Sequence, residues 1–275
     1  MKKLGIIMGI ILTLIVSFML ASHFLVTTNI KLAETYIKDE RIPSSFDGAR
    51  IIQFSDTLIH NESDLNLLQK VVKKINKTHP DIVVFTGDLF SSDNVAKELS
   101  TQTQAILSEI EASIMKIAVL GDHDVLYHEE LVTQTFTSSN FTVLRNEILQ
   151  VYNGSSDVLT FVGLDSLQQT QNYQSLITQV NDSTFNFLLL HEPNLASLMT
   201  DEAIDVQLSG HCLGTNQIRQ TDDKNTVNYC EQFYNGTYPF VDQLLLYVSD
   251  GVNSSMTYTH PLKRPSIHSF LLLKP

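Results

Sequence analysis

The chain is poor in positive charge. It has 18 Lys and Arg against 30 Asp and Glu, which gives a formal net charge of −12. Binding to nucleic acid or to anionic lipid headgroups needs clustered positive charge, so this balance argues against both. The lysine cluster Lys70, Lys73, Lys74 and Lys77 has helical spacing, which indicates the exposed face of one helix. We therefore expect no nucleic acid partner.

Cysteines and linkers are also scarce. With only two cysteines, Cys212 and Cys230, the chain can form at most one internal disulfide. In an extracellular setting these two residues can be bonded, and two unrelated thiols are the alternative. We find no Gly/Ser-rich or Pro-rich linker and no internal repeat. The chain beyond its N-terminal segment is therefore predicted to form one large domain.

Charge is absent from residues 4–26, a run whose only ionisable side chain is His23. About 20 apolar residues span the hydrocarbon core of a bilayer as a helix. Lys2 and Lys3 before the run favour a cytoplasmic N-terminus. A cleaved signal peptide is the alternative, but its apolar core has about 7–15 residues, and Met19-Leu20-Ala21 is a poor cleavage site. The run is therefore interpreted as an uncleaved transmembrane anchor.

This interpretation divides the chain into three parts. Residues 1–28 are the cytoplasmic start and transmembrane signal-anchor, residues 29–47 are a juxtamembrane segment, and residues 48–275 are the extracellular domain. The predicted location is the cell membrane, with a single pass and the C-terminal domain outside.

Hydrophobic periodicity predicts an α/β fold. In the first half, strands are predicted at residues 49–54, 81–85 and 116–120, and helices at residues 64–75 and 95–114. Strands that alternate with helices favour a largely parallel sheet. In the second half, strands are predicted at residues 141–145, 148–152, 158–162, 185–190, 206–209 and 244–248, with fewer helices between them. We expect two sheets packed face to face with helices outside.

Carboxylates and imidazoles follow five of these strands. They are Asp56, Asp88, Asp122 with its neighbours His123 and Asp124, His191, and His211. The carboxyl ends of strands in α/β folds converge on one crevice, so we expect these side chains to lie together. Mixed oxygen and nitrogen ligands suit Mn, Fe or Zn.

The motifs Gly87-Asp88, Gly121-Asp122-His123-Asp124 and Gly210-His211, together with Asp56 and His191, resemble those of the calcineurin-like metallophosphoesterases. The resemblance is strongest to their membrane-anchored bacterial branch and runs from about residue 48 to the C-terminus. It implies a four-layer α/β/β/α sandwich of two mixed sheets, preceded here by the transmembrane helix. A phosphorylated small molecule is the implied substrate, and the predicted location beside the membrane suggests a lipid-linked phosphoester.

The resemblance also implies roles for the residues. Asp88 would bridge two metal ions and Asp56 would bind the first of them. Asp122, His191 and His211 would bind the second ion together with Asp88. His123 would face the phosphate and help to protonate the leaving group, so His123 and Asp88 are the predicted catalytic residues.

Two leucines depart from the family pattern. Leu58 and Leu213 stand where the family has histidine ligands of the first metal, and leucine offers no lone pair. We therefore expect one divalent ion, Mn, Zn or Fe, rather than two. Asp122 replaces an asparagine and adds negative charge beside the expected phosphate position. His60 and Cys212 are conceivable replacement ligands, although an exposed loop position is the commoner setting for a residue like His60.

Two functions are compatible with this pattern. The first is a metal-dependent hydrolase of reduced activity that cleaves phosphoester or phosphoanhydride bonds at the outer membrane face. The second is a pseudoenzyme that serves as a membrane-anchored binding domain, because a fold does not by itself fix an activity. We assign the remaining histidines to the surface or to packing; these are His79, His128, His260 and His268.

Overall fold

The computed structural model describes residues 9–14, 16–17, 29–167, 173–200, 202–215, 229–240, 244–253 and 264–275. Within these residues, no helix has both the length and the apolar character needed to cross a membrane. The predicted membrane-spanning segment, residues 4–26, lies mostly outside the described part of the chain. Its described residues, 9–14 and 16–17, are helical and exposed.

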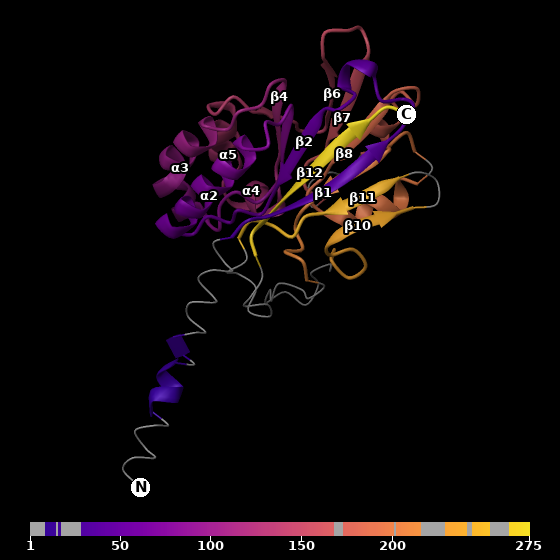
Figure 1. The fold of residues 1–275 in the computed structure, drawn as a ribbon. Coiled ribbons are helices and arrows are strands. Elements are labelled where there is room, and N and C mark those ends of the chain that lie inside the picture. Colours follow the sequence, from indigo (N-terminus) through magenta and orange to yellow (C-terminus); the bar gives the residue numbers. More distant parts are fainter. Residues whose placement is uncertain are drawn as a thin grey trace.

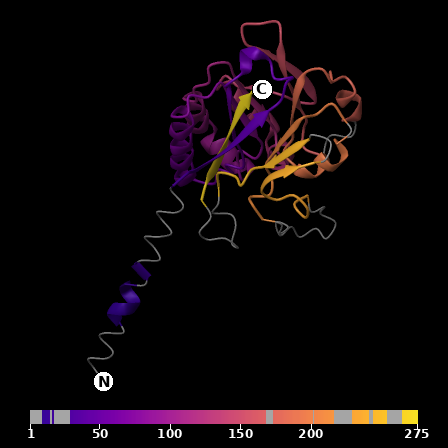
Figure 2. The same ribbon diagram turned by 45° about the vertical axis from the view of Figure 1, so that its right-hand side comes forward.

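The first sheet has six strands in the order β1-β12-β2-β3-β4-β5. They are β1 (Lys31–Lys38), β12 (Ser266–Leu273), β2 (Arg50–Phe54), β3 (Ile82–Thr86), β4 (Met115–Val119) and β5 (Thr142–Val143). The strands from β2 to β5 are parallel, whereas β12 is antiparallel to β2 and parallel to β1. Figures 1 and 2 show β1 and β12 side by side.

The second sheet also has six strands, in the order β10-β11-β9-β8-β7-β6. They are β10 (Gly236–Pro239), β11 (Leu245–Val248), β9 (Val206–Ser209), β8 (Phe185–Leu189), β7 (Val158–Gly163) and β6 (Glu147–Tyr152). The four central strands are parallel and the two outer ones are antiparallel. Both sheets are therefore mixed, as predicted.

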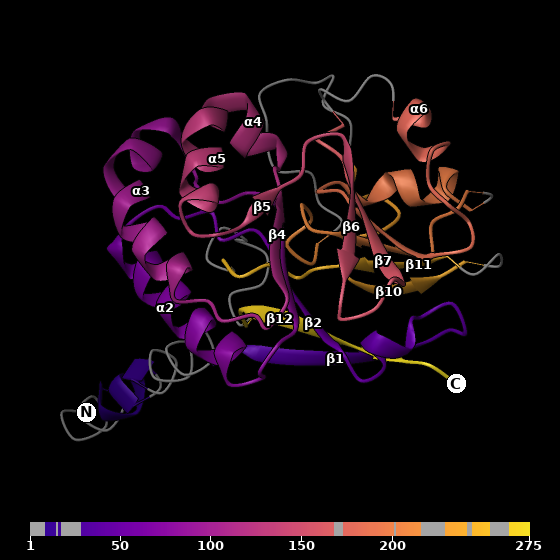
Figure 3. The ribbon, with the colours of Figure 1, turned by 90° about the horizontal axis from the view of Figure 1, so that it is seen from above.

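Helices cover the outer faces of both sheets, which gives four layers (Figure 3). The first sheet is covered by α2 (Glu62–Asn76), α3 (Asp93–Ser108), α4 (Asp122–Tyr127) and α5 (Glu129–Thr137). The second sheet is covered by α6 (Gln174–Ile177) and the 3₁₀ helix η2 (Pro193–Leu198), while η1 (Ser44–Phe46) precedes β2. Three apolar clusters fill the spaces between the layers, one of them between the two sheets.

Side-chain hydrogen bonds explain where α2 begins and where α3 ends. The Asn61 side chain accepts the N–H of Ser63 at 2.8 Å, and the Asp64 carboxylate accepts the N–H of Asn61 at 3.2 Å. This reciprocal capping begins α2. The prediction of a helix through residue 114 is wrong, because α3 ends at Ser108. The side chain of Asn76 bonds the carbonyl of Glu109 and the N–H of Glu111, which ties the following segment into a turn.

The strand predictions are confirmed except at one place, and three strands were not predicted. The strand expected at residues 141–145 is only Thr142–Val143. Strands β1, β10 and β12 had no counterpart in the sequence analysis. β1 has a mixed burial pattern typical of a sheet edge, so its sequence KLAETYIK carries no strong strand signal.

The register places the first residues of β1 and of β12 at the edge where β2 ends. His268 lies opposite Gln53 in the antiparallel pair, and Ser266 therefore lies level with the end of β2. Lys31 pairs with Ser266, so β1 also begins at this edge. The carboxyl ends of β2, β3 and β4 and the first residues of β1 and β12 thus share one edge.

His268 lies in the apolar space between the two sheets. Its ring lies 3.8 Å from the Tyr247 ring and 4.4 Å from the Phe270 ring, measured between centroids. Its Nε2 atom is 2.8 Å from the hydroxyl of Thr35. Burial, with a smaller effect of Lys31, lowers the pKa of His268 to about 3. Of the other histidines assigned to the surface or to packing, His79 is exposed and His128 is buried. His260 lies outside the described residues.

His268 makes the fold sensitive to acid. An unfolded histidine has a pKa of about 6.5, so between pH 6.5 and 3 the unfolded chain binds a proton that the folded chain excludes. The stabilising contribution is complete above pH 6.5 and is lost as the pH falls. When the pH is lowered from 7.5 to 4.5, we expect the unfolding free energy to fall. The fall is expected to be about 3 kcal/mol smaller in His268→Gln than in the parent. Urea unfolding at several pH values measures this, with His79→Gln as the exposed control. Equal losses in the parent and in His268→Gln would contradict the assignment.

Candidate metal centre

Each predicted ligand follows a strand and lies at the same end of the two sheets. Asp56 follows β2, Asp88 follows β3 and Asp122 begins α4 directly after β4. His191 follows β8 and His211 follows β9, so the second sheet supplies both imidazoles. The side chains of Asp56, Asp88 and His191 are fully buried.

Several of these residues occupy the left-handed region of backbone space. Asp56 has a φ of 51°, Asp88 of 66° and His211 of 71°. For residues other than glycine this conformation costs about 1 kcal/mol or more each. Such backbone strain clusters at functional sites, where the surrounding structure holds it in place.

Glycine permits the closest approach of the two loops from the first sheet. A Cβ atom on Gly121 would lie 2.3 Å from Oδ1 of Asp88, and one on Gly87 would lie 2.4 Å from Nδ1 of His191. Gly87 also has a φ of 96°, which a side chain would disfavour. Any larger residue at either position would push the ligands apart.

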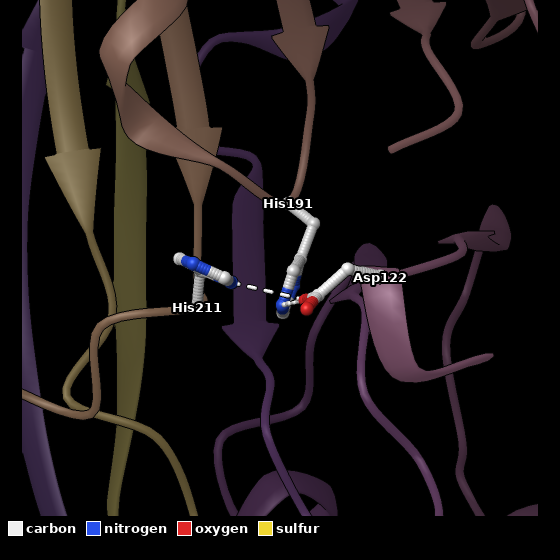
Figure 4. A group of neighbouring side chains, drawn as sticks. All are labelled: Asp122, His191 and His211. Carbon is white, nitrogen blue, oxygen red and sulfur yellow. Dashed lines mark hydrogen bonds and ion pairs between the residues drawn. The ribbon is translucent and has the colours of Figure 1, made fainter. Parts of the chain in front are cut away.

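Among the described residues, two overlapping groups have the spacing of metal ligands. One group is Asp122, His191 and His211, and the other is Asp56, Asp88 and His191. Figure 4 shows the first group, with both imidazoles turned toward the Asp122 carboxylate. The structure therefore brings all five predicted ligands to one place but divides them between two groups that share His191.

A hydrogen bond fixes the chemistry of His191. Its Nδ1 atom is 2.6 Å from the carbonyl oxygen of Thr86, which can only accept, so Nδ1 carries the proton. In the neutral ring, Nε2 then holds a lone pair. Nε2 is buried and makes no hydrogen bond, although carboxylate oxygens surround it. A cation among these carboxylates would satisfy the lone pair.

The distances between donor atoms fit a metal ion. Nε2 of His191 is 3.4 Å from Oδ2 of Asp88 and 3.3 Å from Oδ1 of Asp122. Nδ1 of His211 is 3.0 Å from the same oxygen of Asp122. Two ligands bound to one ion at about 2.1 Å lie about 3.0–3.4 Å apart in octahedral or tetrahedral geometry. The residues present therefore fit a divalent metal.

The charges of the site are strongly coupled. Burial would raise the pKa of Asp88 and of Asp122, but the neighbouring imidazoles hold both pKa values well below the usual range. Burial would likewise lower the pKa of His191, and the carboxylates of Asp88, Asp122 and Asp56 raise it well above its usual value. The carboxylates of Asp56, Asp88 and Asp122 therefore favour a cation at the centre of the site, and a divalent ion would fulfil this role.

Asp124 joins the loop after β3 to the loop after β4 through backbone hydrogen bonds. Its carboxylate accepts the N–H groups of Asp88 at 2.8 Å, Leu89 at 2.8 Å and Gly121 at 3.0 Å. It is fully buried, and burial together with the Asp88 charge raises the pKa of Asp124 to about 7 against the effect of these N–H donors. These three bonds set the positions of Asp88 and of the start of α4.

The other candidate residues surround this centre. The N–H of His123 donates to Oδ1 of Asp88 at 3.1 Å, and the His123 side chain is half-buried. His60 is exposed, with Nδ1 3.1 Å from the hydroxyl of Ser91, and belongs to neither ligand group. Cys212 is bonded to Cys230, so its sulfur is not available as a thiolate ligand. The disulfide that the sequence left open is therefore formed.

Three residues near the centre were missed by the sequence analysis. Thr86 contributes a backbone carbonyl, which leaves no trace in side-chain chemistry. Asp124 is part of the quoted Gly121–Asp124 motif, and its position at the start of a helix could have suggested a carboxylate that accepts backbone N–H groups. Tyr229, whose ring meets the His211 ring, precedes Cys230, so only knowledge of the disulfide could have placed it.

Comparisons with known proteins agree with this geometry. Residues 49–214 match the family model described as calcineurin-like phosphoesterase. The metallophosphoesterase YkuE of Bacillus subtilis, itself described as uncharacterized, is 30% identical over 248 residues, which cover 88% of this chain and 85% of that protein. The UDP-2,3-diacylglucosamine pyrophosphatase LpxG of Chlamydia muridarum is 25% identical over 224 residues, 64% of this chain and 68% of that protein.

A solved structure supports the fold. A dimetal phosphatase from Danio rerio superposes with a TM-score of 0.51 at 10% sequence identity, covering 82% of this chain and 93% of that chain. At this identity the likeness concerns the arrangement of sheets and helices alone.

The role of Asp124 can be tested by replacing its carboxylate with an amide. Asn offers one acceptor oxygen where three N–H groups need acceptors, so Asp124→Asn leaves buried donors unpaired. We expect the unfolding free energy to fall by about 1–3 kcal/mol and the Mn²⁺ dissociation constant to rise about tenfold. Calorimetric titration of the full-length protein measures the affinity. Asp47→Asn is the matched control, because Asp47 accepts a single backbone N–H, from Lys274, before the start of β2. Unchanged Mn²⁺ affinity in Asp124→Asn would contradict the positioning role.

Proposed function

The chain belongs to the calcineurin-like phosphoesterase family, and we propose that it hydrolyses phosphoester or phosphoanhydride bonds with one divalent ion. The observation that carries this proposal is the convergence of Asp122, His191 and His211 at ligand spacing, with the Nε2 atom of His191 buried among carboxylates. We propose Asp88 as a further ligand, because its Oδ2 atom is 3.4 Å from the same Nε2 atom.

The proposal of one ion rests on the Asp56 side of the site. Leu58 and Leu213 are buried there, with 0% and 3% of their surfaces exposed. A methyl group on Gly251 would lie 2.7 Å from Cδ2 of Leu213 and 3.0 Å from Cβ of Asp56, so Leu213 packs beside Asp56. The Asp56 carboxylate also accepts bonds from the Ser55 hydroxyl and the His211 N–H. Apolar side chains thus replace two of the ligands that a first ion would need.

The chain's own residues would orient the reaction. A bound divalent ion lowers the pKa of a water molecule and polarises a phosphoryl oxygen. Thr86 holds the His191 ring in the tautomer that presents Nε2, and Asp124 fixes the backbone of Asp88. His123 lies in the first turn of α4 beside Asp88 and is proposed to give a proton to the leaving oxygen. The carboxylate of Asp122 adds negative charge, which strengthens cation binding and weakens binding of an anionic substrate.

We propose a cell-membrane location, with the domain outside and an anchor in residues 1–28. The uncharged run at residues 4–26 and the preceding Lys2 and Lys3 support this proposal. A lipid-linked phosphoester or phosphoanhydride is the proposed substrate class. The Chlamydia relative, a UDP-2,3-diacylglucosamine pyrophosphatase, supports a lipid-linked phosphoanhydride as the substrate.

A second candidate function is a pseudoenzyme that binds a ligand without turnover. The paired replacement of ligands by Leu58 and Leu213 favours it, because both losses fall on the same predicted ion. The two candidates differ in turnover and share the fold, so only activity separates them.

Metal stoichiometry tests the proposed centre. The full-length protein in detergent, loaded with Mn²⁺ or Zn²⁺ and desalted, is expected to retain one ion per chain by elemental analysis. His211→Ala removes an imidazole ligand and is expected to retain less than a tenth of an ion. His79→Ala, at an exposed position, is the matched control.

A variant with histidine at both leucine positions gives a second test of the number of bound ions. The double variant Leu58→His/Leu213→His is expected to retain two ions, because both replaced positions flank Asp56. Two ions in the parent would contradict the one-ion proposal. No retained ion in the parent would contradict the metal-dependent hydrolase altogether.

Turnover separates the two candidate functions. With Mn²⁺, the parent is expected to hydrolyse bis(p-nitrophenyl) phosphate above background, and Asp88→Asn to lose this activity. His123→Ala is expected to lower kcat by about 10²–10⁴-fold while Mn²⁺ affinity stays within twofold, because His123 is proposed as a proton donor and not a ligand. A parent that binds Mn²⁺ but shows no turnover would establish the pseudoenzyme.

A further inference from the structure

The disulfide between Cys212 and Cys230 lies at the rim of the candidate metal centre. It joins the turn after β9 to the segment before β10, across a sequence separation of 18 residues. Both cysteines are buried in the apolar cluster that covers the outer face of the second sheet. The bond therefore connects the site to a segment that is otherwise distant along the chain.

The disulfide brings two aromatic rings together. His211 precedes Cys212 and Tyr229 precedes Cys230, so the bond places the two residues side by side. Their ring centroids are 5.8 Å apart, with an angle of 65° between the ring planes, an edge-to-face contact. The His211 ring also contacts Asp122, with Nδ1 3.0 Å from the carboxylate. Tyr229 is half-buried, so part of its surface remains exposed to solvent while its ring contacts the His211 ring.

His211 and Tyr229 depend on the disulfide to different degrees. His211 directly follows the last residues of a central strand, and its N–H donates to the Asp56 carboxylate at 3.2 Å. Tyr229 lies outside the helices and strands, in a turn before β10. Breaking the bond would therefore release Tyr229 while His211 keeps its own anchor.

The negative charge of the site disfavours phosphate binding, and Tyr229 can offer a neutral hydrogen-bond donor. Asp56, Asp88 and Asp122 carry three negative charges, and one divalent ion leaves the centre anionic. A phosphate would be repelled unless neutral hydrogen-bond donors compensate. A phenol supplies such a donor, and its ring offers a flat apolar surface to the rest of the substrate.

We propose that Tyr229 is a substrate-binding residue of this centre: its hydroxyl donates a hydrogen bond to a phosphoryl oxygen beside His211, and the Cys212–Cys230 disulfide positions it. This inference rests on the proposed metal-dependent function. It adds that binding of the phosphate, and not of the metal, depends on the oxidised state of the two cysteines.

Separate titrations of metal and phosphate test the inference in the full-length protein. Mn²⁺ is titrated first, and inorganic phosphate is then titrated into the Mn²⁺-loaded protein by calorimetry. Tyr229→Phe removes only the hydroxyl and is expected to raise the phosphate dissociation constant about tenfold, with the Mn²⁺ constant within twofold. Tyr234→Phe, a partly buried tyrosine beyond Cys230, is the matched control and is expected to change neither constant.

The disulfide is tested by its dependence on Tyr229. Cys212→Ser/Cys230→Ser is expected to weaken phosphate binding about as much as Tyr229→Ala does. Combined with Tyr229→Ala, it is expected to add less than a twofold further loss, because both changes remove the same contact. If the disulfide were purely structural, its removal would weaken phosphate binding by the same factor in the parent and in Tyr229→Ala.

The possible outcomes separate this inference from the function on which it rests. Parent-like phosphate binding in Tyr229→Phe and Tyr229→Ala would overturn the inference alone. Full additivity of the disulfide and Tyr229 changes would overturn the positioning role of the disulfide. A parent that retains no Mn²⁺ would overturn the proposed function and this inference together, whereas a parent that binds Mn²⁺ but no phosphate would overturn the inference.

Discussion

The hydrogen bond from His191 to the carbonyl of Thr86 joins the two sheets at the point where the candidate centre lies. Thr86 ends β3 in the first sheet and His191 follows β8 in the second. A second link lies directly beneath it, where the Gln53 amide donates to the Thr86 hydroxyl at 2.9 Å and to the Ser209 carbonyl at 3.0 Å. The ligand geometry therefore depends on how the sheets are packed, because neither sheet alone carries a complete set of ligands.

The sequence predicted the central strands well and the edges poorly. Strands such as β3, whose residues are all buried, produce continuous apolar runs that are easily found. β1 lies at an edge and alternates exposed and half-buried residues, and β10 has only four residues, so neither gives a strong pattern. The helix after residue 93 was predicted too long because side-chain bonds from Asn76, distant in sequence, ended it. Tertiary contacts of this kind are not visible in local periodicity.

Side-chain ligands could be predicted, but the atoms that hold them could not. Asp and His at strand ends indicate a metal site by their residue types, and the structure brings all five predicted ligands together. Thr86 acts through its main chain and Tyr229 through a covalent link elsewhere, so their residue types say nothing about the site. The division of the ligands into two groups that share His191 is a matter of distances, which spacing along the chain does not determine.

The parallel pairing of β1 with β12 determines at which edge the chain enters the domain. Because Lys31 is level with Ser266 at the edge where β2 ends, the chain enters the domain at the same edge that carries the ligands. An anchor before Asn29 would hold that edge toward the bilayer, and the opposite edge, where β12 ends at Leu273, would face away. The candidate centre would then lie on the side of the domain that faces the lipid headgroups, so a substrate could remain in the membrane plane and reach it by lateral diffusion.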